Sequence, residues 1–582
     1  MKENLEKLVT SWMSLDIKLV NENNTHELEK RLKNRIQFGT AGLRAPMQAG
    51  FSGMNEVTVL QASQGLAVYV LKSVKDAISR GVVIGHDHRH NSKRFAEIAA
   101  MCFSHLNFKV FLYDGLVHTP LVPFGVIELD AALGIMITAS HNPAQDNGYK
   151  VYWENGCQII PPLDLEISQE IENNLTPWTW DTSLVTTDPK MTEIILEKYF
   201  SKIKSTLIDE HIFELTKNVS DLPIVYTAMH GVGNEPFQEI SKLLGLSNNI
   251  INTEKQMLPD PDFSTVKFPN PEESGALDIA KIKADETGAN IILANDPDAD
   301  RFAVAVKDRL SGSWVQLTGN QLGALFADYE LKRYNSTPEL SIKPLAFLNS
   351  TVSSQLIRTM AIREHFHYED TLTGFKWIGN RAQELVKSGY FVPFAFEEAI
   401  GYMFEVVFDK DGISAAVVFL QMVIKWHLEG TTALEELEKI YQKYGFFAEY
   451  NSYFIANDSN VISSVFNKIR YGNDNENCNY FKGPPKMIGV YKVISWRDLT
   501  IGYDSTTVDN KPKLPVSSSS QMITVELESL EQEKIRFTAR GSGTEPKLKV
   551  YIEANSKTGE RAKRLAKKVW DLLGDEWFHE LK

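Results

Sequence analysis

Residues 133–143 read LGIMITASHNP, a short apolar run that ends in a polar turn. The apolar half has the length of a buried strand, and the Asn-Pro pair at its end interrupts regular structure. Two earlier apolar runs, at residues 82–85 and 110–113, flank a helical pattern over residues 94–105. Strands that alternate with helices predict an α/β layer with a mostly parallel sheet. Ligands bind such sheets at the carboxyl ends of strands, which is where Ser140 stands.

The same alternation of strands and helices occurs twice more along the chain. Apolar runs at residues 222–226 and 291–294 mark a second unit, and residues 344–348 belong to a third unit that extends to about residue 445. The remainder mixes polar turns with short β-like runs and closes with an amphipathic helix over residues 559–573. We therefore predict three similar mixed α/β sheet domains and a smaller C-terminal α+β domain. The predicted seams lie near residues 205, 318 and 447.

The composition is that of a large globular protein. Of the 582 residues, 43% are hydrophobic and 23% are charged, so several domains can each bury a core. The net charge of −14 argues against nucleic acid as a partner, because a phosphate backbone needs a basic surface. No stretch approaches the roughly 20 apolar residues that span a bilayer, and no signal-type segment begins the chain. Three separate cysteines without a CxxC pair favour a reducing compartment, so we predict a cytoplasmic protein with no membrane partner.

Ser140 is the first candidate for chemistry. It stands beside His141 in the polar turn, and Lys150, ten residues on, begins another apolar run and could reach back over the turn. A Ser-His hydrolase is one alternative, but sequence neighbours rarely have the geometry of a catalytic pair, and the G-x-S-x-G elbow is absent. A plain polar turn is the other alternative, and the segment alone leaves both open.

Residues 295–301, NDPDADR, carry an aspartate at every second position directly after an apolar strand. Three such carboxylates can converge on a hard cation, and without one their mutual repulsion would be costly. An EF-hand loop is excluded, because Arg301 takes the place of its glycine and Lys307 the place of its glutamate. A solvated acidic turn is the alternative. The predicted metal ligands, which leave room for an outside oxygen, are Asp296, Asp298 and Asp300.

Residues 540–547, RGSGTEPK, combine two glycines, two hydroxyl groups and an arginine between two apolar runs. Close backbone approach, N–H donors and a guanidinium fork are the chemistry of a phosphate cradle. The spacing of a Walker loop is absent, and a flexible hairpin turn is the alternative. Glycine-containing loops with ligand-type side chains also occur at residues 39–44, 373–379 and 396–402, each of which on its own is more typical of a structural turn.

Taken together, these segments resemble the α-D-phosphohexomutase superfamily over nearly the whole chain. Its serine, metal, sugar and phosphate loops occur in the expected order as TASHNP, DPDADR, FEEA and RGSGTEP. The segments IQFGTAGLRA, SHNPAQDNGYKVYW, TLTGFKWIGNR and FEEAIGYMF are most similar to the eukaryotic phosphopentomutase branch, above all to fungal phosphoribomutases. The resemblance implies four domains around a central cleft. They are a catalytic phosphoserine domain (1–205), a metal-binding domain (206–318), a sugar-binding domain (319–447) and a phosphate-binding domain (448–582).

The resemblance also implies a role for individual residues. Ser140 would carry a phosphoryl group, one oxygen of which completes the coordination of one Mg²⁺ ion by the three aspartates. The implied catalytic residues are Ser140, His141, Lys150, Arg44 and Lys410. The implied substrate-binding residues are Arg301, Thr373, Gly374, Lys376, Glu397, Ala399, Arg540, Ser542, Gly543 and Thr544. Lys150 or Lys410 could accept the proton of a substrate hydroxyl, provided that burial or neighbouring cations depress its pKa.

The implied activity is that of a monomeric phosphosugar mutase. It would interconvert ribose 1-phosphate and ribose 5-phosphate through a bisphosphate intermediate, with secondary phosphoglucomutase activity, and would be primed by ribose 1,5-bisphosphate or glucose 1,6-bisphosphate. Phosphoglucomutases commonly carry a serine where Ala399 stands, and the missing hydroxyl weakens the case for a hexose substrate. The alternatives are a phosphoglucomutase, a glucose-1,6-bisphosphate synthase, a metal-dependent phosphatase and, in another class, an inactive regulator that binds sugar phosphates.

Overall fold

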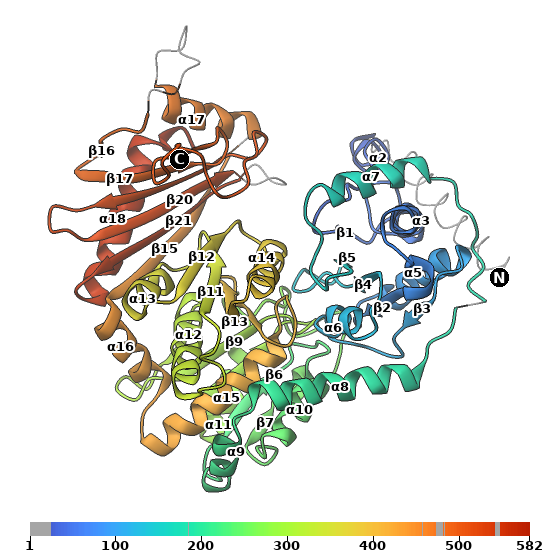
Figure 1. Ribbon diagram of the computed structural model, residues 1–582, viewed down its shortest axis with the longest axis horizontal. Coiled ribbons are helices and arrows are strands. Elements are labelled where there is room, and N and C mark those ends of the chain that lie inside the picture. Colours follow the sequence, from blue (N-terminus) through green and yellow to red (C-terminus); the bar gives the residue numbers. More distant parts are fainter. Residues whose placement is uncertain are drawn as a thin grey trace. The chain divides into compact units, whose positions relative to one another are not determined.

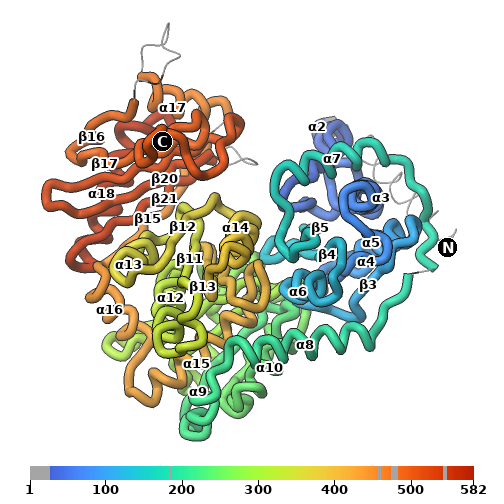
Figure 2. The backbone as a smooth tube through the Cα atoms, viewed as in Figure 1, coloured from blue at the N-terminus to red at the C-terminus, as the bar shows by residue number. Residues whose placement is uncertain are grey.

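The computed structural model describes residues 25–183, 185–456, 458–472, 481, 483–541 and 547–581. The chain divides into two compact units, each described by itself below (Figure 1). The first unit comprises Met1–Ala346 and Gly374–Leu434, and the second comprises Phe347–Thr373 and Glu435–Lys582. Figure 2 follows the same chain as a tube, so that each segment can be located by its residue number.

The first domain contains a five-stranded sheet with the order β1-β5-β4-β2-β3. Its strands are β1 (Leu43–Pro46), β2 (Val82–His86), β3 (Val110–Leu112), β4 (Leu133–Ile137) and β5 (Asp146–Trp153). β2, β3 and β4 are parallel, whereas β5 runs antiparallel to both β4 and β1. Its helices are α2 (Thr25–Leu32), α3 (Glu56–Ser73), α4 (Ala77–Arg80), α5 (Ser92–His105), α6 (Leu121–Glu128) and α7 (Leu163–Asn173). The predicted strands and the predicted helix over residues 94–105 are confirmed.

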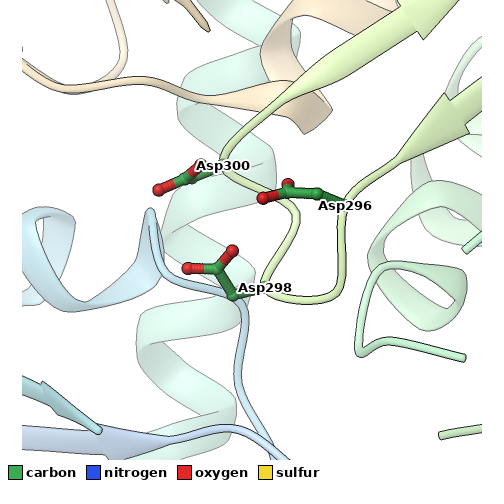
Figure 3. A group of neighbouring side chains, drawn as sticks. All are labelled: Asp296, Asp298 and Asp300. Carbon is green, nitrogen blue, oxygen red and sulfur yellow. The ribbon is translucent and has the colours of Figure 1, made fainter. Parts of the chain in front are cut away.

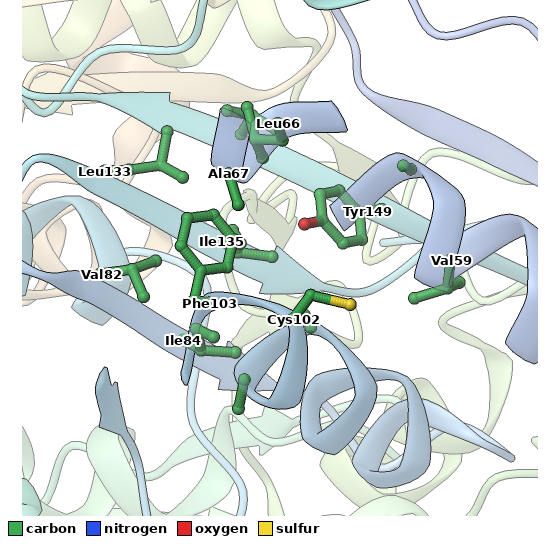
Figure 4. Close-up of a cluster of buried hydrophobic side chains, with 14 of the residues drawn as sticks. Val59, Leu66, Ala67, Val82, Ile84, Cys102, Phe103, Leu133, Ile135 and Tyr149 are labelled. Carbon is green, nitrogen blue, oxygen red and sulfur yellow. The ribbon is translucent and has the colours of Figure 1, made fainter. Parts of the chain in front are cut away.

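The core of this domain lies between the sheet and helices α3 and α5 (Figure 4). Ile84 of β2 and Ile135 of β4 pack with Leu66 of α3 and Phe103 of α5, and all four are fully buried. Strands covered by helices on both faces bury every side chain, which is why β2 and β4 read as continuous apolar runs without alternation.

The second domain repeats this plan with the strand order β10-β9-β8-β6-β7. Its strands are β6 (Ile224–Thr227), β7 (Ile250–Asn252), β8 (Ile291–Asn295), β9 (Phe302–Lys307) and β10 (Trp314–Gln316). Its helices are α8 (Pro189–Leu207), α9 (Glu210–Leu215), α10 (Asn234–Leu243) and α11 (Asp278–Thr287), with 3-10 turns at Thr216–Asn218 and Glu254–Gln256. β6, β7 and β8 are parallel and β9 returns antiparallel, as β5 does in the first domain. The predicted structural repeat is thus visible in the sheet order.

The third domain again alternates helices and strands. Its strands are β11 (Leu345–Ser350), β12 (His367–Thr371), β13 (Phe391–Glu397) and β14 (Gly401–Phe404). Its helices are α12 (Gly319–Ser336), α13 (Leu356–Glu364), α14 (Phe375–Lys387), α15 (Gly412–Glu429) and α16 (Ala433–Tyr444). β13 and β14 form an antiparallel pair. The boundary between the two compact units passes through β11, after Ala346. Helix α15 is apolar on nearly all sides because it is buried within the first unit.

The C-terminal domain, which lies in the second unit, is an antiparallel sheet with the order β15-β21-β20-β19-β17-β16, with β18 paired to β17. Its strands are β15 (Phe446–Ile455), β16 (Met487–Ile488), β17 (Tyr491–Asp498), β18 (Tyr503–Asp504), β19 (Met522–Glu528), β20 (Lys534–Gly541) and β21 (Lys547–Ser556). Its helices are α17 (Ser459–Tyr471) and α18 (Gly559–Glu576), with a 3-10 turn at His579–Leu581. Burial alternates along β21, as expected for a sheet whose two faces differ in burial. The predicted smaller α+β domain and its closing helix are confirmed.

Three of the predicted functional loops lie at strand ends of the first unit. Ser140 follows β4, the aspartate segment follows β8, and residues 398–400 join β13 to β14. Each loop contains a non-glycine residue in the left-handed region, with φ values of 52° for Ser140, 54° for Ala299 and 50° for Ile400. Such conformations cost about 1–3 kcal/mol each and cluster at functional sites.

The predicted domain boundaries meet the secondary structure in different ways. The boundary near residue 205 falls inside helix α8, whereas the boundary at residue 318 falls on Thr318, the residue that caps α12. The exact boundaries stay predictions. In the part of the chain that the structure describes, no helix combines the length and the apolar character that crossing a bilayer would need.

Candidate active site

The three aspartates of residues 295–301 lie together in the loop between β8 and β9. Figure 3 shows Asp296, Asp298 and Asp300 projecting from this loop with their carboxylates on one side. One oxygen of each lies within 4.8 Å of the others, and all three residues are at most 2% exposed. Left-handed Ala299 tightens the loop through its N–H, which donates to the carbonyl of Asp296 at 2.9 Å.

The donor set of this loop fits a hard divalent cation. Each aspartate has a buried oxygen without a hydrogen-bond partner, and these atoms are Asp296 Oδ2, Asp298 Oδ1 and Asp300 Oδ1. Buried carboxylate oxygens are rarely left unpaired, and oxygen ligands are those that Mg²⁺ prefers. Burial and the charges of the other two aspartates raise the pKa of Asp296 well above its ordinary value. The three carboxylates therefore disfavour one another's charge, and a cation bound by their free oxygens would relieve that repulsion.

Ser140 lies against this loop. Its Oγ donates to Asp298 Oδ2 at 3.0 Å, and its own N–H donates to Thr138 Oγ1 at 2.9 Å. The side chain is almost fully buried, with 4% of the residue exposed. The structure thus brings together the serine turn of the first domain and the aspartates of the second.

Two predicted lysines also contact the aspartates. Lys150 Nζ lies 2.7 Å from Asp298 Oδ2 and 2.8 Å from Asp300 Oδ2, and Lys410 Nζ lies 3.3 Å from the same Asp300 oxygen. Burial favours the neutral amine, but the charges of Asp298 and Asp300 prevail and raise the pKa of Lys150. The charges of Asp300 and Asp409 likewise prevail over burial and raise the pKa of Lys410. The sequence allowed a lysine base only with a depressed pKa, and the role of either lysine as a base stays a prediction.

Three further predicted residues surround the serine turn. Exposed Arg44 donates to Asn142 Oδ1 at 3.3 Å. Arg301, which follows the last aspartate, keeps a buried Nε without a hydrogen-bond partner. Burial, together with the positive charges of Arg301 and Arg44, lowers the pKa of His141 well below its ordinary value, so the imidazole is neutral. Cationic side chains thus converge on the space beside Ser140.

The sugar-loop candidates of the first unit are held by contacts between loops. Glu397 Oε1 accepts a hydrogen bond from the N–H of Gly374 at 2.7 Å. Lys376 Nζ donates to Thr40 Oγ1, which belongs to the glycine-containing loop before Arg44. Ala399 is half-buried in the turn that joins β13 to β14. Glu397 also acts electrostatically on Arg301, which connects this loop to the aspartate loop.

The remaining candidates belong to the second unit. Arg540 at the end of β20 donates from Nη1 to Thr373 Oγ1, just beyond β12. Ser542, Gly543 and Thr544 lie outside the described residues. Their predicted role, and the central cleft that the resemblance implies, stay predictions.

Thr119 is a site residue that the sequence reasoning missed. Its Oγ1 donates to Asp298 Oδ2 at 2.6 Å and its N–H donates to the carbonyl of Asp298 at 2.9 Å. Arg89, which follows β2, is a second missed residue and contacts the serine turn. Arg89 stands shortly after β2, so the rule that placed Ser140 could also have found it, whereas Thr119 lies just before α6 and no such signal marks it.

Family comparisons agree with this architecture. Models of the phosphoglucomutase/phosphomannomutase α/β/α domains I, II and III match residues 35–177, 197–312 and 318–444 in that order. The model of the C-terminal domain of the same family matches residues 512–572. Together the four models cover more than half of the chain.

Similar proteins cover the chain almost completely. Phosphoribomutase of Saccharomyces cerevisiae is 51% identical over 584 residues, which span 96% of this chain and 93% of that protein. Phosphopentomutase of Mus musculus is 44% identical over 576 residues, spanning 96% and 90%. Glucose 1,6-bisphosphate synthase of Homo sapiens is 40% identical over 567 residues, spanning 95% and 87%.

A solved structure supports the fold. The crystal structure of parafusin, a phosphoglucomutase from Paramecium, superposes with a TM-score of 0.65 at 17% identity and covers 94% of this chain and 96% of its own. At that identity the likeness concerns the fold alone. The chain is therefore a mutase enzyme of the phosphoglucomutase/phosphomannomutase family, in the eukaryotic phosphopentomutase branch of the α-D-phosphohexomutase superfamily.

Proposed function

We propose that this chain interconverts ribose 1-phosphate and ribose 5-phosphate through a phosphorylated Ser140. The observation that carries the proposal is the hydrogen bond of 3.0 Å between Ser140 Oγ and Asp298, beside three aspartate oxygens without partners. A serine that only completed a turn would not need to face such a loop. A nucleophile that carries a phosphoryl group next to a cation site does need it.

The residues present fit one Mg²⁺ ion. Asp296, Asp298 and Asp300 would hold it through their unpaired oxygens, and an oxygen of phosphorylated Ser140 would complete the set. When bound, the ion would supply positive charge beside the phosphoryl oxygens. The clustering of three carboxylates, each with a buried oxygen that lacks a hydrogen-bond partner, supports a divalent ion at this place.

The proposed reaction has two transfers. In the first, the bond between phosphorus and Ser140 Oγ breaks and a bond to the free hydroxyl oxygen of the sugar phosphate forms, which gives a bisphosphate. The hydroxyl proton leaves the sugar, and one proton returns to Ser140 Oγ when the serine is regenerated. In the second, the bond between the other phosphorus and its sugar oxygen breaks, a bond to Ser140 Oγ forms, and the proton of Ser140 is replaced by one gained by that sugar oxygen. The sugar then leaves with its phosphate at the other position. The serine relay lets the two distant hydroxyl groups exchange a phosphate without attack by water.

The surrounding cations would stabilise the transferring group. Arg44 and Arg301 lie near Ser140 and carry N–H groups that can bind phosphoryl oxygens. Lys150 and Lys410, whose pKa values are raised, are charged at neutral pH. They enter the proposal as groups that stabilise negative charge on the transferred phosphoryl.

The pentose preference is supported by two observations. The relatives named phosphoribomutase and phosphopentomutase are more similar to this chain than glucose 1,6-bisphosphate synthase is. Ala399 offers no hydroxyl group to a hexose. Weak phosphoglucomutase activity and synthesis of glucose 1,6-bisphosphate are the second candidate functions, because the same serine and metal loop would serve them.

The distal phosphate and the priming bisphosphate belong to the same proposal. Arg540 contacts Thr373, and the glycine-containing segment that follows Arg540 has the composition of a phosphate cradle. A sugar bisphosphate, ribose 1,5-bisphosphate or glucose 1,6-bisphosphate, would phosphorylate Ser140 before the first turnover. A cytoplasmic location and a monomeric state stay predictions.

The nucleophile is tested with Ser140→Ala. Ser336→Ala, an exposed serine at the end of α12, is the matched control. We expect loss of mutase activity and of phosphate incorporation from the priming bisphosphate in the first variant and wild-type behaviour in the second. Undiminished turnover of Ser140→Ala would disprove the relay.

The substrate is tested by comparing kcat/KM for ribose 1-phosphate and glucose 1-phosphate, with and without each priming bisphosphate. We expect the higher value for ribose 1-phosphate. A higher value for glucose 1-phosphate would favour a phosphoglucomutase, and release of free phosphate would reveal a phosphatase instead.

A further inference from the structure

Arg89 makes an unusually large set of contacts with the serine turn. Its Nη2 donates to the carbonyl oxygens of Ser140 at 2.5 Å and Asn142 at 2.6 Å. Its Nη1 donates to the carbonyl oxygens of Pro143 at 2.8 Å and Asp146 at 3.2 Å. The Arg89 side chain is completely buried. One guanidinium group thus donates hydrogen bonds to four main-chain carbonyls within seven consecutive residues.

The hydrogen bonds from Arg89 to the serine turn have a physical reason. The turn lies between β4 and β5, so no regular ladder pairs its carbonyls, although the Pro143 carbonyl also accepts a hydrogen bond from the Asp146 N–H at 3.0 Å. Ser140 also holds a left-handed φ of 52°, which is costly for a residue other than glycine and persists only when its surroundings impose it. A planar guanidinium group that binds carbonyls from Ser140 at one end of the turn to Asp146 at the other is such a constraint.

Arg89 is itself held in place from two sides. Asp87 Oδ2 lies 3.3 Å from its Nε, and Asp87 Oδ1 accepts hydrogen bonds from the Arg89 N–H at 3.0 Å and from Ser92 Oγ at 2.6 Å. On the other side, the centroid of the Phe263 ring lies 4.8 Å from the guanidinium carbon. The Arg89 side chain therefore has little freedom to leave the turn.

Phe263 comes from the second domain and is unusual in its own right. It is 2% exposed and has a left-handed φ of 47°, and its ring also meets His88 edge-on at 5.3 Å. An aromatic face that covers a buried guanidinium compensates for part of the hydration that the arginine lost. Arg89 thus lies between a strained serine and a strained phenylalanine, one from each of the two domains that supply the nucleophile and the aspartates.

We propose that Arg89, covered by Phe263, is a positioning residue that holds the serine turn in the conformation from which Ser140 exchanges its phosphoryl group. It does not touch the reacting atoms. It acts by fixing the carbonyl side of the turn, so that Ser140 Oγ stays directed at Asp298. The inference rests on the proposed function, because its measure is the phosphorylation of Ser140.

A lysine cannot replace this arginine. The ammonium group of a lysine carries its three N–H donors on one nitrogen atom. In Arg89, two separate nitrogens of a planar group donate to the four carbonyls. Arg89→Lys would keep the positive charge and much of the side-chain volume. It would lose the hydrogen bonds that two separate nitrogens make to the turn. Any effect of this variant therefore reports on geometry and not on net charge.

The experiment uses the full chain and glucose 1,6-bisphosphate as the phosphorylating probe. The single-turnover rate of Ser140 phosphorylation is measured for the wild type, Arg89→Lys and Arg94→Lys. Arg94, whose Nε lies 3.2 Å from a carboxylate oxygen of Glu56 on the surface of the same domain, is the matched control. We expect Arg89→Lys to slow phosphorylation by about tenfold or more, with kcat falling in parallel and KM for the sugar phosphate changing less than about threefold. The control should behave as the wild type.

A local readout separates positioning from general damage. We expect faster hydrogen exchange of the amides in residues 138–147 of Arg89→Lys, with the rest of the first domain unchanged. Phe263→Leu, which keeps an apolar side chain and removes the ring face, should slow phosphorylation by a few-fold with the same unchanged KM. This second variant tests the inference even if Arg89→Lys does not fold.

Each outcome decides one of the two ideas. Suppose that the wild type is phosphorylated at Ser140 and that both folded variants react at the wild-type rate. This result overturns the role of Arg89 and leaves the proposed function intact. A fall in activity that comes wholly from a higher KM also overturns it. Wild-type protein that is never phosphorylated at Ser140 overturns the proposed function itself.

Discussion

The Nζ atom of Lys150 lies 2.7 Å from Asp298 Oδ2, and both side chains are buried. The lysine comes from β5 in the first domain and the aspartate from the loop after β8 in the second. The same aspartate oxygen accepts the hydroxyl of Ser140. One oxygen atom therefore joins the nucleophile, a cation and the aspartate loop, so a change at any of the three should alter the other two.

Asp296→Asn should stabilise the protein in the absence of metal and remove its stabilisation by Mg²⁺. Asp296 Oδ1 accepts a hydrogen bond from the Arg301 N–H at 2.9 Å, which an asparagine oxygen retains. Burial and the neighbouring carboxylates disfavour the charge of Asp296, so a neutral amide should raise the free energy of unfolding by about 1 kcal/mol. Thermal unfolding in EDTA and in excess Mg²⁺ measures both effects.

The control for this variant is Asp571→Asn, an exposed position on α18. It should show the wild-type response to Mg²⁺. If Mg²⁺ raised the unfolding temperature of Asp296→Asn as much as that of the wild type, the metal would have to bind elsewhere.

Gly42→Ala should lower kcat/KM by about tenfold or more and reduce thermal stability, whereas Gly39→Ala in the same loop should do neither. Gly42 has φ of +72°, and a Cβ atom there would lie 1.7 Å from the carbonyl oxygen of Tyr149. Relief of that clash would separate β1 from β5 and displace both Arg44 and Lys150. A Cβ atom at Gly39 meets nothing within 4 Å. Equal behaviour of the two variants in the mutase assay would contradict this account.

Ala399→Ser should shift the substrate preference toward glucose 1-phosphate. A new hydroxyl in the turn between β13 and β14 could bind a sugar hydroxyl, and a net hydrogen bond of about 1 kcal/mol corresponds to about a fivefold change in relative kcat/KM. Ala399→Cys has a similar volume and a much weaker donor, so it should leave the ratio unchanged. A ratio that moves equally in both variants would show that volume, and not the hydroxyl, sets the preference.

Glu330→Gln should make the stability of the first unit less dependent on pH. Glu330 in α12 is 1% exposed, and burial raises its pKa to about 7, although Arg333 lies 2.7 Å away. A carboxyl group with a raised pKa stabilises the fold when protonated, and this stabilisation is lost as the pH rises from about 4.5 through about 7. The wild type should therefore lose up to about 3 kcal/mol over that range from this group, and the variant should not.

Unfolding by urea at about pH 5 and about pH 8 measures this difference. Glu339→Gln, an exposed position shortly after α12, is the control and should follow the wild type. Arg333 keeps Glu405 as a partner at 2.7 Å in the variant, so its charge is not left unpaired. An unchanged pH dependence in Glu330→Gln would show that Glu330 titrates in its ordinary range.

The sequence alone determined the fold class and the main chemical groups of the site. Continuous apolar runs such as residues 133–137 predict buried parallel strands, because strands covered on both faces have no polar side. The aspartate loop could be recognised because its three ligands are local, spaced two residues apart. Ser140 could be placed because a strand directly precedes it. These are short-range features, and short-range features can be read along the chain.

The tertiary structure alone decided which of these groups meet and how they are charged. Lys150 and Asp298 are 148 residues apart, and Ser140 and Asp298 are 158 residues apart, so no local pattern relates them. The raised pKa values of Lys150 and Lys410 follow from carboxylates that other segments supply, so their direction could not be read along the chain, and the role of either lysine as a base stays a prediction. Arg89 has the same origin, because it is one arginine among many until the fold places four carbonyls of the serine turn around it. Coulomb and hydrogen-bond energies depend on distance in space, and that distance exists only after the chain has folded.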